Sequence, residues 1–274
     1  MTGYSKELFK DKVVLVTGGR SGIGYAIAKH FLNLGATVVI SSRKEEMLLK
    51  ACEALSEFGA CKAKTCDIRK VEEVEELANY IKQEAGKLDI LINNAGGQFP
   101  APAEQMSPNG WSAVINNNLN GTFFVAKQMY LSFFKEQQHG VVVNITANVF
   151  RGFPGMAHTG AARAGVENMT KTLAMEWAEH NVRMNAVAPG TIESSGLETY
   201  HPKIQEMFSE GKKANLMGRF GTVDDVANAV LFLSSPMSSY ISGITMYVDG
   251  LEHLSQDRMA FLNTLKNIMN DSKT

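Results

Sequence analysis

The sequence predicts an α/β fold in which a parallel β-sheet is covered by helices on both faces. Short apolar runs alternate along the chain with segments whose apolar residues recur at helical spacing. The first run, Val13–Thr17, opens with consecutive apolar residues, which is typical of a strand buried on both faces. With 274 residues, 45% of them hydrophobic, and no low-complexity linker, the chain can bury the core of one large domain.

Apolar runs predict the strands of this sheet, and amphipathic segments predict its helices. The strands are expected at residues 13–17, 37–41, 61–66, 88–92, 140–146, 183–187 and 245–248. Helical spacing of apolar residues covers 23–34, 47–58, 71–81, 111–134, 161–178 and 259–269. We therefore expect one domain over residues 1–253 and a C-terminal helical extension over 254–274, which packs on the body or on a partner subunit.

A glycine-rich turn, T-G-G-R-S-G-I-G at 17–24, links the first strand to the first helix. Gly18, Gly22 and Gly24 allow the backbone to turn tightly and to approach a pyrophosphate closely. A pyrophosphate at this place would lie against the positive N-terminal end of the helix. The spacing G-x-x-x-G-x-G therefore predicts a nucleotide site, and a glycine turn with a purely structural role is the alternative.

The charge balance and the cysteines exclude several classes of protein. The 27 basic and 28 acidic residues leave a formal net charge of −1, so we expect no nucleic-acid partner and no membrane surface. No apolar run approaches membrane-spanning length, and the N-terminus lacks the apolar core of a leader. Cys52, Cys61 and Cys66 are too few and wrongly spaced for a disulfide framework or a four-ligand zinc site. The expectation is a cytoplasmic protein with reduced cysteines and no metal.

The segment 191–221 interrupts the alternation of strands and helices. It follows the predicted sixth strand and combines hinge-type residues with apolar ones, so we interpret it as a substrate lid. An ordinary surface loop is the alternative. The hinge-type residues are Gly196, Pro202, Gly211 and Gly218, and the apolar ones are Ile204, Met207 and Phe208.

The glycine turn is the first of several short motifs that occur in order along the chain. The others are Asp67-Ile68, N-N-A-G at 93–96, Asn118 within N-L-N-G, and P-G at 189–190. Together they resemble the short-chain dehydrogenase/reductase family over about residues 10–250. The resemblance implies a single Rossmann-type doubly wound domain with a seven-stranded parallel sheet, a nicotinamide cofactor across the carboxyl edge of the strands, and a homotetramer.

Other residues occupy the catalytic positions of that family. Its Tyr-x-x-x-Lys is T-G-A-A-R at 159–163, and its serine position is Ala147. Either this chain catalyses a different reaction from that of the typical family member, or it is a cofactor-binding relative that has lost its activity. The stretches 93–104 and 158–171 resemble peroxisomal trans-2-enoyl-CoA reductases and, more distantly, 2,4-dienoyl-CoA reductases, which favours the first interpretation. This resemblance implies that NADPH reduces a carbon–carbon double bond of a small-molecule acyl-CoA substrate.

The end of the second strand predicts which nicotinamide cofactor binds. An NAD enzyme usually has an acidic residue there, which repels a 2′-phosphate. This chain has Ser42 and Arg43, both of which can bind a phosphate, and Arg20 of the glycine turn is expected near the same pocket. We therefore predict NADP(H). The alternative is that Arg43 and Lys44 are solvated charges at the start of a helix.

The resemblance assigns the remaining cofactor contacts residue by residue. Asp67 is expected to accept a hydrogen bond from the adenine amino group, and a helix N-cap is its alternative role. The expected cofactor-binding residues are Gly18, Arg20, Ser21, Gly22, Ile23, Gly24, Ser42, Arg43, Asp67, Ile68, Asn94, Ala95, Gly96, Arg163, Pro189, Gly190 and Ile192.

The catalytic positions indicate how such a reaction would run. Hydride transfer to the β-carbon of an unsaturated thioester moves charge onto the thioester oxygen, which hydrogen-bond donors must stabilise. Thr159 can donate to that oxygen or orient a water. Arg163 can anchor the nicotinamide ribose as a permanent cation, with a helix-surface arginine as the alternative. By the resemblance, Asn118 kinks a helix and holds a water.

The proton that completes the reaction has three candidate sources. His158 lies beside Thr159 and could act as an acid, although a single histidine is often structural. Tyr200 of the expected lid is a second candidate, and solvent is the third.

Apolar residues in loops near the carboxyl edge could line a slot for the acyl chain, although core packing explains them equally well. They are Phe99, Phe150, Phe153, Met156, Leu197, Met207 and Phe208. Arg151 and Lys212-Lys213 are candidates for binding CoA phosphates. Two other functions compete with the enoyl-CoA reductase: a carbonyl or alcohol oxidoreductase, for example of a terpenoid alcohol or aldehyde, and a non-catalytic NADP-binding scaffold.

Overall fold

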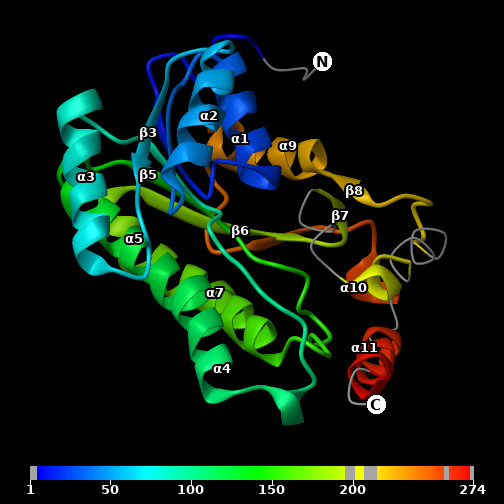
Figure 1. Ribbon diagram of the computed structural model, residues 1–274. Helices are drawn as coiled ribbons and strands as arrows, with labels where there is room; N and C mark the ends of the chain where they lie inside the picture. Colours follow the sequence, from blue (N-terminus) through cyan, green and yellow to red (C-terminus); the bar gives the residue numbers. More distant parts are fainter. Residues whose placement is uncertain (1–4, 195–200, 207–214, 256–258, 272–274) are drawn as a thin grey trace.

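The computed structural model describes residues 5–194, 201–206, 215–255 and 259–271. Seven strands form its main sheet: β1 (Val13–Thr17), β2 (Thr37–Ser42), β3 (Cys61–Thr65), β4 (Ile90–Asn93), β5 (Gly140–Ile145), β6 (Val182–Pro189) and β9 (Thr245–Val248). Their order is β3-β2-β1-β4-β5-β6-β9, and all neighbours are parallel (Figure 1). The predicted single, doubly wound α/β domain with a seven-stranded parallel sheet is confirmed.

The strand order reverses at β1, which has β2 on one side and β4 on the other. Val16 of β1 pairs with Ile40 of β2 and with Ile92 of β4, so the three strands reach the same edge of the sheet. In doubly wound sheets, the ligand-binding crevice lies at this reversal, outside the carboxyl ends of the strands.

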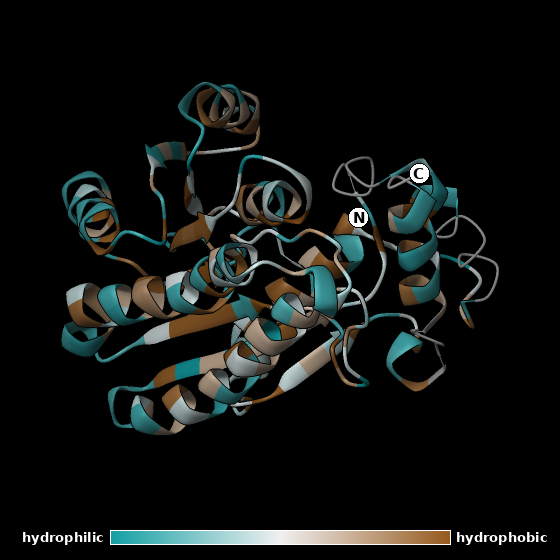
Figure 2. Cartoon of the chain, turned by 60° about the horizontal axis from the view of Figure 1, so that its bottom comes forward, coloured by the Kyte–Doolittle hydropathy of each residue, from teal (hydrophilic) through white to brown (hydrophobic). Residues whose placement is uncertain are grey.

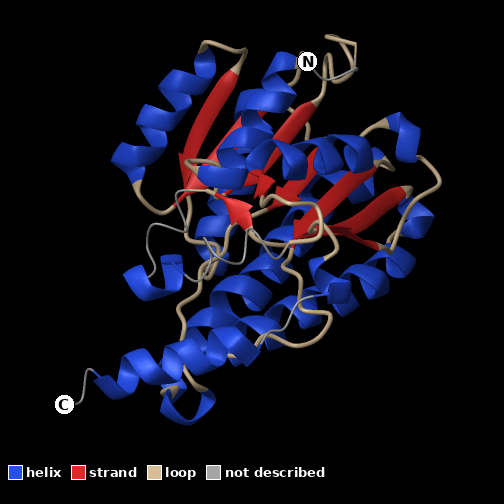
Figure 3. Cartoon of the chain, turned by 90° about the vertical axis from the view of Figure 1, so that its right-hand side faces the viewer, coloured by secondary structure: helices blue, strands red, loops and turns tan. Residues whose placement is uncertain are grey.

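Helices cover both faces of the sheet. One face carries α1 (Gly22–Asn33), α2 (Glu45–Ser56) and α9 (Val223–Ser234), and the other carries α3 (Val71–Ala85), α5 (Gly121–Met129) and α7 (Ala157–Glu176). Alternate strand residues point to opposite faces, so Val14 and Val16 of β1 join the first core and Val13 and Leu15 join the second. Figure 2 shows hydrophobic residues along the strands, and Figure 3 shows the strands enclosed between the helices.

The helix predicted over 111–134 belongs to a longer helical segment with two π-helical turns. α4 (Pro108–Ile115) continues through the π turn Asn116–Asn120 into α5, and the π turn Tyr130–Phe134 leads into α6 (Lys135–Gln137). A π turn redirects the side chains that follow it and is frequent at functional sites. Asn118 lies in the first of these turns.

The two ends of the segment predicted as a lid are joined by a small sheet that the sequence did not predict. β7 (Ile192–Glu193) pairs in parallel with β8 (Gly221–Thr222), directly before α9. Residues 195–200 and 207–214 of this segment, including Gly196 and Gly211, lie outside the described residues.

The C-terminal residues form α10 (Glu252–Ser255) and α11 (Met259–Asp271). α11 packs on the body, because a Cβ added to Gly155 would lie 2.7 Å from the Phe261 ring and 3.2 Å from Leu265. The other described elements are three short 3-10 turns, Ala103–Gln105, Ala178–His180 and Pro236–Ser238, and the helical residues 202–206. None of the helices in the described ranges is long and apolar enough to cross a membrane.

Candidate active site

The glycine turn leaves an open helix N-terminus at the carboxyl end of β1. Gly18 and Gly22 adopt φ values of +67° and +56°, in the region that favours glycine. A Cβ added to Gly24 would lie 2.5 Å from the Gly18 carbonyl oxygen, so helix and turn pack backbone to backbone. Ser21 makes no side-chain cap to α1, and the first turn of α1 carries no acidic residue. This N-terminus can therefore accept a phosphate group.

The motif N-N-A-G holds the glycine turn in place. The Asn94 side-chain amide donates to the carbonyl oxygens of Thr17 and Gly18 at 3.0 and 3.3 Å. In return, the Thr17 hydroxyl accepts from the backbone amides of Asn94 and Ala95, each at 3.0 Å. These bonds join the ends of β1 and β4, where the strand order reverses.

A pocket opens beside this turn, and its cations face no acidic side chain among its lining residues. The hydroxyl oxygens of Ser41 and Ser42 are buried there without a hydrogen-bond partner. The lining residues are Gly18, Arg20, Ser41, Ser42, Arg43, Lys44, Cys66, Ile68, Ala95, Gly96 and Asn117. Two unpaired hydroxyls beside three cations form a suitable environment for a phosphate ester.

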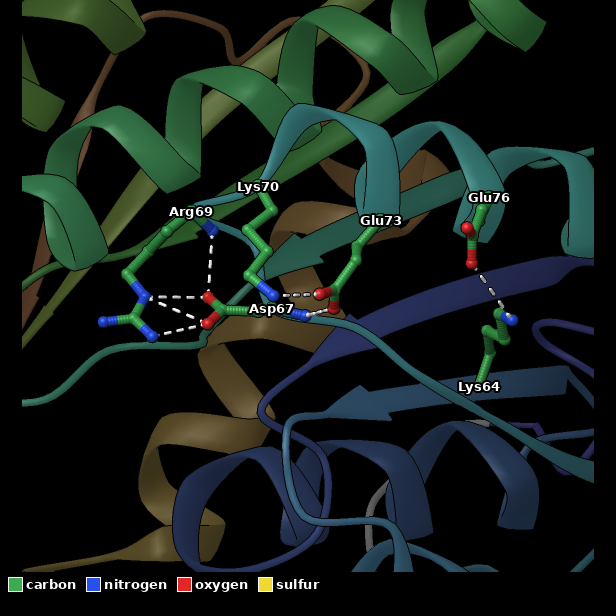
Figure 4. A network of polar contacts seen from close by, with 6 residues as sticks. All are labelled: Lys64, Asp67, Arg69, Lys70, Glu73 and Glu76. Carbon is green, nitrogen blue, oxygen red and sulfur yellow. Dashed lines mark hydrogen bonds and ion pairs between the residues drawn. The ribbon is translucent and has the colours of Figure 1, made fainter.

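Asp67 is paired with a residue that the sequence analysis did not consider. The Arg69 guanidinium donates to both carboxylate oxygens of Asp67, at 2.8 Å from Nε to Oδ1 and 2.5 Å from Nη2 to Oδ2 (Figure 4). This hydrogen bonding lowers the pKa of Asp67. The alternative role of Asp67 as a helix N-cap is wrong, because Lys70 is the residue that precedes α3. A carboxylate has four lone pairs, so Asp67 can still accept from an adenine amino group while Arg69 holds it.

Arg163 is buried against the same edge of the sheet. α7 begins at Ala157 rather than at the predicted residue 161, so Thr159 and Arg163 lie one turn apart on it. The Arg163 guanidinium donates to the Ile145 carbonyl at 3.0 Å, and the residue is only 7% exposed. The alternative of a helix-surface arginine is therefore wrong. Burial lowers the pKa of Arg163 to about 10, which still leaves it charged at neutral pH.

Arg163 meets Asn118 at Gly96. A Cβ added to Gly96 would collide with the Arg163 guanidinium and would lie 3.1 Å from the Asn118 side-chain oxygen. Asn118 is fully buried, and its side chain binds both backbone polar groups of Gly97. Asn117 donates to the Asn118 side chain at 3.3 Å and lines the pocket, a contact that the sequence analysis missed.

Thr159 and His158 are fully buried side by side. The Thr159 hydroxyl lies 3.2 Å from His158 Nδ1, and the edge of the His158 ring packs on Phe99 at 4.7 Å between centroids. Burial lowers the pKa of His158, which favours the neutral imidazole. A neutral, buried histidine is a poor proton donor, so the geometry favours the structural role for His158.

The remaining predicted residues lie after β6, in other loops and helices, or outside the described residues. Gly190 follows β6 and packs on Asp249, and Ile192 lies in β7. Met156 is buried, whereas Phe99 and Phe150 are exposed. Leu197, Tyr200, Met207, Phe208, Lys212 and Lys213 lie outside the described residues. The described residues contain no group of three or more His, Cys, Asp or Glu side chains that could hold a metal ion.

A polar cluster at the end of β9 was also missed. It comprises Asn148, Asp249 and His253, linked by hydrogen bonds of 2.9 and 2.8 Å. Asn148 and Asp249 are 101 positions apart in the chain, so no local motif connects them.

Comparisons with known proteins agree with this geometry. The sequence profile described as Enoyl-(Acyl carrier protein) reductase matches residues 18–250. The chain is 40% identical over 255 residues to the peroxisomal 2,4-dienoyl-CoA reductase of Rattus norvegicus, covering 90% of this chain and 85% of that protein. The solved citronellol catabolism dehydrogenase AtuB of Pseudomonas aeruginosa is 38% identical with a TM-score of 0.82, covering 92% and 98% of the two chains. A variant of actinorhodin polyketide ketoreductase, solved with NADPH, is 30% identical with a TM-score of 0.84, covering 89% and 97%.

The fold and the site define a nicotinamide-dependent oxidoreductase with an α/β sheet. The chain belongs to the short-chain dehydrogenase/reductase family, as its motifs indicated. The acyl-CoA relative reported above is a 2,4-dienoyl-CoA reductase, the resemblance that the sequence analysis placed second.

The residues at the carboxyl edge fit a nicotinamide dinucleotide. The open N-terminus of α1 suits the pyrophosphate, and the pocket at Ser42 and Arg43 suits the adenosine end. The buried Arg163 supplies a cation that lies against Gly96 at the same edge of the sheet. At Gly18 and Gly96 the absence of a side chain lets Asn94 and Arg163 pack directly on the backbone of the two loops.

Proposed function

We propose that the protein is an NADPH-dependent reductase of the carbon–carbon double bond of a trans-2-enoyl-CoA. The observation that carries this proposal is the buried pair Thr159 and Arg163 at the catalytic positions of the family. A carbonyl reductase needs an acid that protonates an alkoxide, and neither a threonine nor an arginine supplies one readily. An enoyl thioester instead needs its developing enolate to be stabilised, for which a buried cation and a hydroxyl are suitable.

In this proposal, each residue of the site has a distinct role. Bound NADPH supplies the hydride. Arg163 provides a fixed positive charge and anchors the ribose, and its burial strengthens the field that it exerts on the reacting group. The Thr159 hydroxyl lies 3.2 Å from His158 Nδ1 in the free protein, and in this proposal it turns from that nitrogen to donate its single proton to the thioester oxygen. Asn118 holds Gly97, and the neighbouring Gly96 leaves room for the Arg163 guanidinium.

The preference for NADPH over NADH rests on the pocket at the end of β2. Ser42 has a buried hydroxyl without a partner, and Arg20, Arg43 and Lys44 supply positive charge without an acidic lining residue. A 2′-phosphate would satisfy these groups, whereas the two ribose hydroxyls of NADH would leave the cations unpaired.

Further parts of the proposal are the oligomer, the lid, the compartment and the substrate range. We propose a homotetramer, a substrate lid within 191–221 whose base is the β7–β8 pair, and a cytoplasmic location, which the free cysteines support. A 2,4-dienoyl-CoA is the second candidate substrate, because the rat relative is a 2,4-dienoyl-CoA reductase. Reduction of a dienoyl-CoA also forms an enolate, an extended one, that needs the same stabilisation.

NADPH oxidation measured with matched substrates tests the proposal. The purified protein should turn over a medium-chain trans-2-enoyl-CoA or a 2,4-dienoyl-CoA and leave the corresponding aldehyde and ketone unchanged. Turnover of carbonyl compounds alone would support the alcohol or aldehyde oxidoreductase instead. Tight NADPH binding without any turnover would support a non-catalytic scaffold.

A further inference from the structure

The polar cluster of Asn148, Asp249 and His253 lies beside the proposed nicotinamide site. Asn148 directly follows Ala147, the serine position of the family, and its backbone amide donates to the Pro189 carbonyl at 2.9 Å. A Cβ added to Gly190 would lie 2.7 Å from the Asp249 Cβ, so Asp249 packs directly on the P-G motif. The cluster is therefore at the carboxyl edge of the sheet.

The cluster also lies on the face of the sheet that carries Arg163. Met246 and Val248 of β9 pack against the core cluster on the face that carries α9. Because successive strand residues point to opposite faces, Tyr247 between them points to the face that carries α7. The Tyr247 ring stacks on the His253 ring at 4.4 Å with 16° between the planes. This stack places His253 on the same side as Thr159 and Arg163.

Asp249 is held as a fixed carboxylate. Its Oδ2 atom accepts from the Asn148 side chain at 2.9 Å, from the His253 backbone amide at 2.7 Å and from His253 Nδ1 at 2.8 Å. Its Oδ1 atom accepts from the Leu251 backbone amide at 3.2 Å. The Asp249 side chain is 3% exposed, so these donors replace the water that a carboxylate would otherwise bind.

His253 is fixed by the turn that precedes it and by the rings around it. Leu251 adopts a φ of +73°, which is unusual for a bulky residue and brings the chain back toward Asp249. The edge of the His253 ring meets Phe150 at 5.9 Å between centroids. Because Nδ1 donates to Asp249, the second ring nitrogen, Nε2, is directed away from that carboxylate. The His253 side chain is 20% exposed and so remains within reach of solvent.

We propose that His253 is the acid that protonates the α-carbon of the substrate and that Asp249 is its positioning residue. This inference rests on the proposed function. After hydride addition, the substrate carries an electron pair shared between the α-carbon and the thioester oxygen. The Nε2–H bond of the His253 imidazolium breaks, a carbon–hydrogen bond forms at the α-carbon, and the imidazole becomes neutral. Solvent then returns a proton to Nε2, while Asp249 holds Nδ1–H throughout.

Few titratable side chains contact His253 within the described part of the chain. Asp249 and Tyr247 are the titratable side chains shown there in contact with His253. Asp249 accepts a hydrogen bond from Nδ1, and Tyr247 stacks on the face of the imidazole ring. The imidazole of α10 thus serves the α-carbon, which is a different atom from the alkoxide oxygen that the family's phenol protonates.

His253→Gln tests the proposal, and His180→Gln is the matched control. His180 also lies beside a carboxylate, with Nδ1 3.5 Å from Glu179, but it precedes β6 at the opposite edge of the sheet. NADPH oxidation is measured with a trans-2-enoyl-CoA, together with the Kd of NADPH. His253→Gln should lower kcat by about 100-fold or more, the effect of losing a general acid, with little change in the Kd of NADPH. His180→Gln should behave as the wild type.

Two further measurements separate an acid from a structural residue. In D2O, the wild type should deliver deuterium to one face of the α-carbon, and His253→Gln should lose this selectivity. Added imidazole should partly restore kcat in His253→Ala. A kcat within about threefold of the wild type in His253→Gln would overturn the role of His253, because loss of a general acid is a much larger effect. Equal loss of NADPH binding and kcat without rescue would also overturn it. If the wild type itself reduces no enoyl or dienoyl thioester, the proposed function fails first, and this inference fails with it.

Discussion

Asn118 holds Gly97 through both ends of its side-chain amide. Its Oδ1 accepts from the Gly97 backbone amide at 2.9 Å, and its Nδ2 donates to the Gly97 carbonyl at 3.0 Å. A π-helical turn directs a fully buried asparagine at the loop after β4. The wall of the pocket at Gly96 is thereby fixed before any cofactor binds.

Asn118→Ala should destabilise the protein and weaken NADPH binding. The substitution removes both hydrogen bonds to the exposed Gly97 and leaves a cavity at the fully buried position 118, which together cost about 1–2 kcal/mol. Urea unfolding and a fluorescence titration with NADPH measure the two effects. Asn120→Ala removes an exposed bond to Asn116 of 2.8 Å and should change stability by less than about 0.5 kcal/mol. Similar losses in both variants would contradict the importance of the contact with Gly97.

Arg43→Asp should discriminate between the two nicotinamide cofactors. A charge-assisted bond to a 2′-phosphate is worth about 1.5–3 kcal/mol, so the Kd of NADPH should rise roughly 10- to 150-fold. The Kd of NADH, which lacks that phosphate, should change much less. Lys50→Ala, which removes an exposed cation of α2 bound to Glu46 at 2.7 Å, serves as the control. Equal changes for the two cofactors in Arg43→Asp would refute the preference for NADP(H).

Arg163→Met should abolish most of the turnover and leave the fold intact. Methionine retains much of the buried volume but removes the charge and the bond to Ile145. Loss of one preorganised electrostatic group lowers kcat by about 100- to 1000-fold. Arg163→Lys retains a cation and should keep more activity than Arg163→Met. Steady-state kinetics and circular dichroism check both points, and unchanged kinetics in Arg163→Met would remove Arg163 from the site.

Gly24→Ala should damage the cofactor site more than Gly86→Ala does. The added methyl group at residue 24 would meet the Gly18 carbonyl at 2.5 Å, so the turn must move and NADPH binding should be lost. Gly86 caps α3 with a φ of +72° and has no atom within 4 Å of an added Cβ. Its substitution should cost about 1 kcal/mol through the backbone alone, with normal NADPH binding. Normal NADPH affinity in Gly24→Ala would show that the close packing is dispensable.

Asp89 should make the stability of the protein depend on pH in the acid range. Burial alone would raise its pKa, but bonds from the Val13 backbone amide and from Lys12 and Lys87 lower it below the ordinary value. A carboxyl whose pKa is lower in the folded state contributes stability that is present above the unfolded pKa of about 3.9 and is lost as the pH falls through the folded pKa.

Asp89→Asn should therefore be less stable than the wild type at pH 7, by about 1–3 kcal/mol, because buried donors lose a charged acceptor. The difference should shrink as the pH falls below about 4, where the wild-type carboxyl also becomes neutral. Urea unfolding at several pH values measures it. Glu46→Gln, at an exposed pair, should show little difference at any pH. A difference that stays constant from pH 7 into the acid range would exclude this linkage.

The sequence predicted the sheet well because each strand and helix is encoded locally. Apolar runs and helical spacing depend on neighbours within a few residues, and the seven strands lie at or near the expected positions. The observed boundaries that differ from the predicted ones are those set by contacts between distant parts of the chain. β6 reaches Pro189 because Asn148 and Val248 continue its ladder, and α7 starts early enough to carry Thr159.

The candidate site also combines features that short motifs predict with features that only distant contacts create. The glycine turn, the cations after β2 and the substitution of Thr159 and Arg163 at the family positions could be read directly, since each is a short motif. Three other features could not be predicted from the sequence, because none of them leaves a periodic signal. They are the burial of Arg163, the bond from Arg69 to Asp67 and the bonds between Asn118 and Gly97.

By itself, the sequence determined the class of fold, the place of the dinucleotide turn and the absence of the usual tyrosine and lysine. Only the tertiary structure decided that Asn148, Asp249 and His253 meet. The physical reason is that a parallel sheet returns every strand to the same edge, so side chains about a hundred positions apart become neighbours only after the whole sheet has formed.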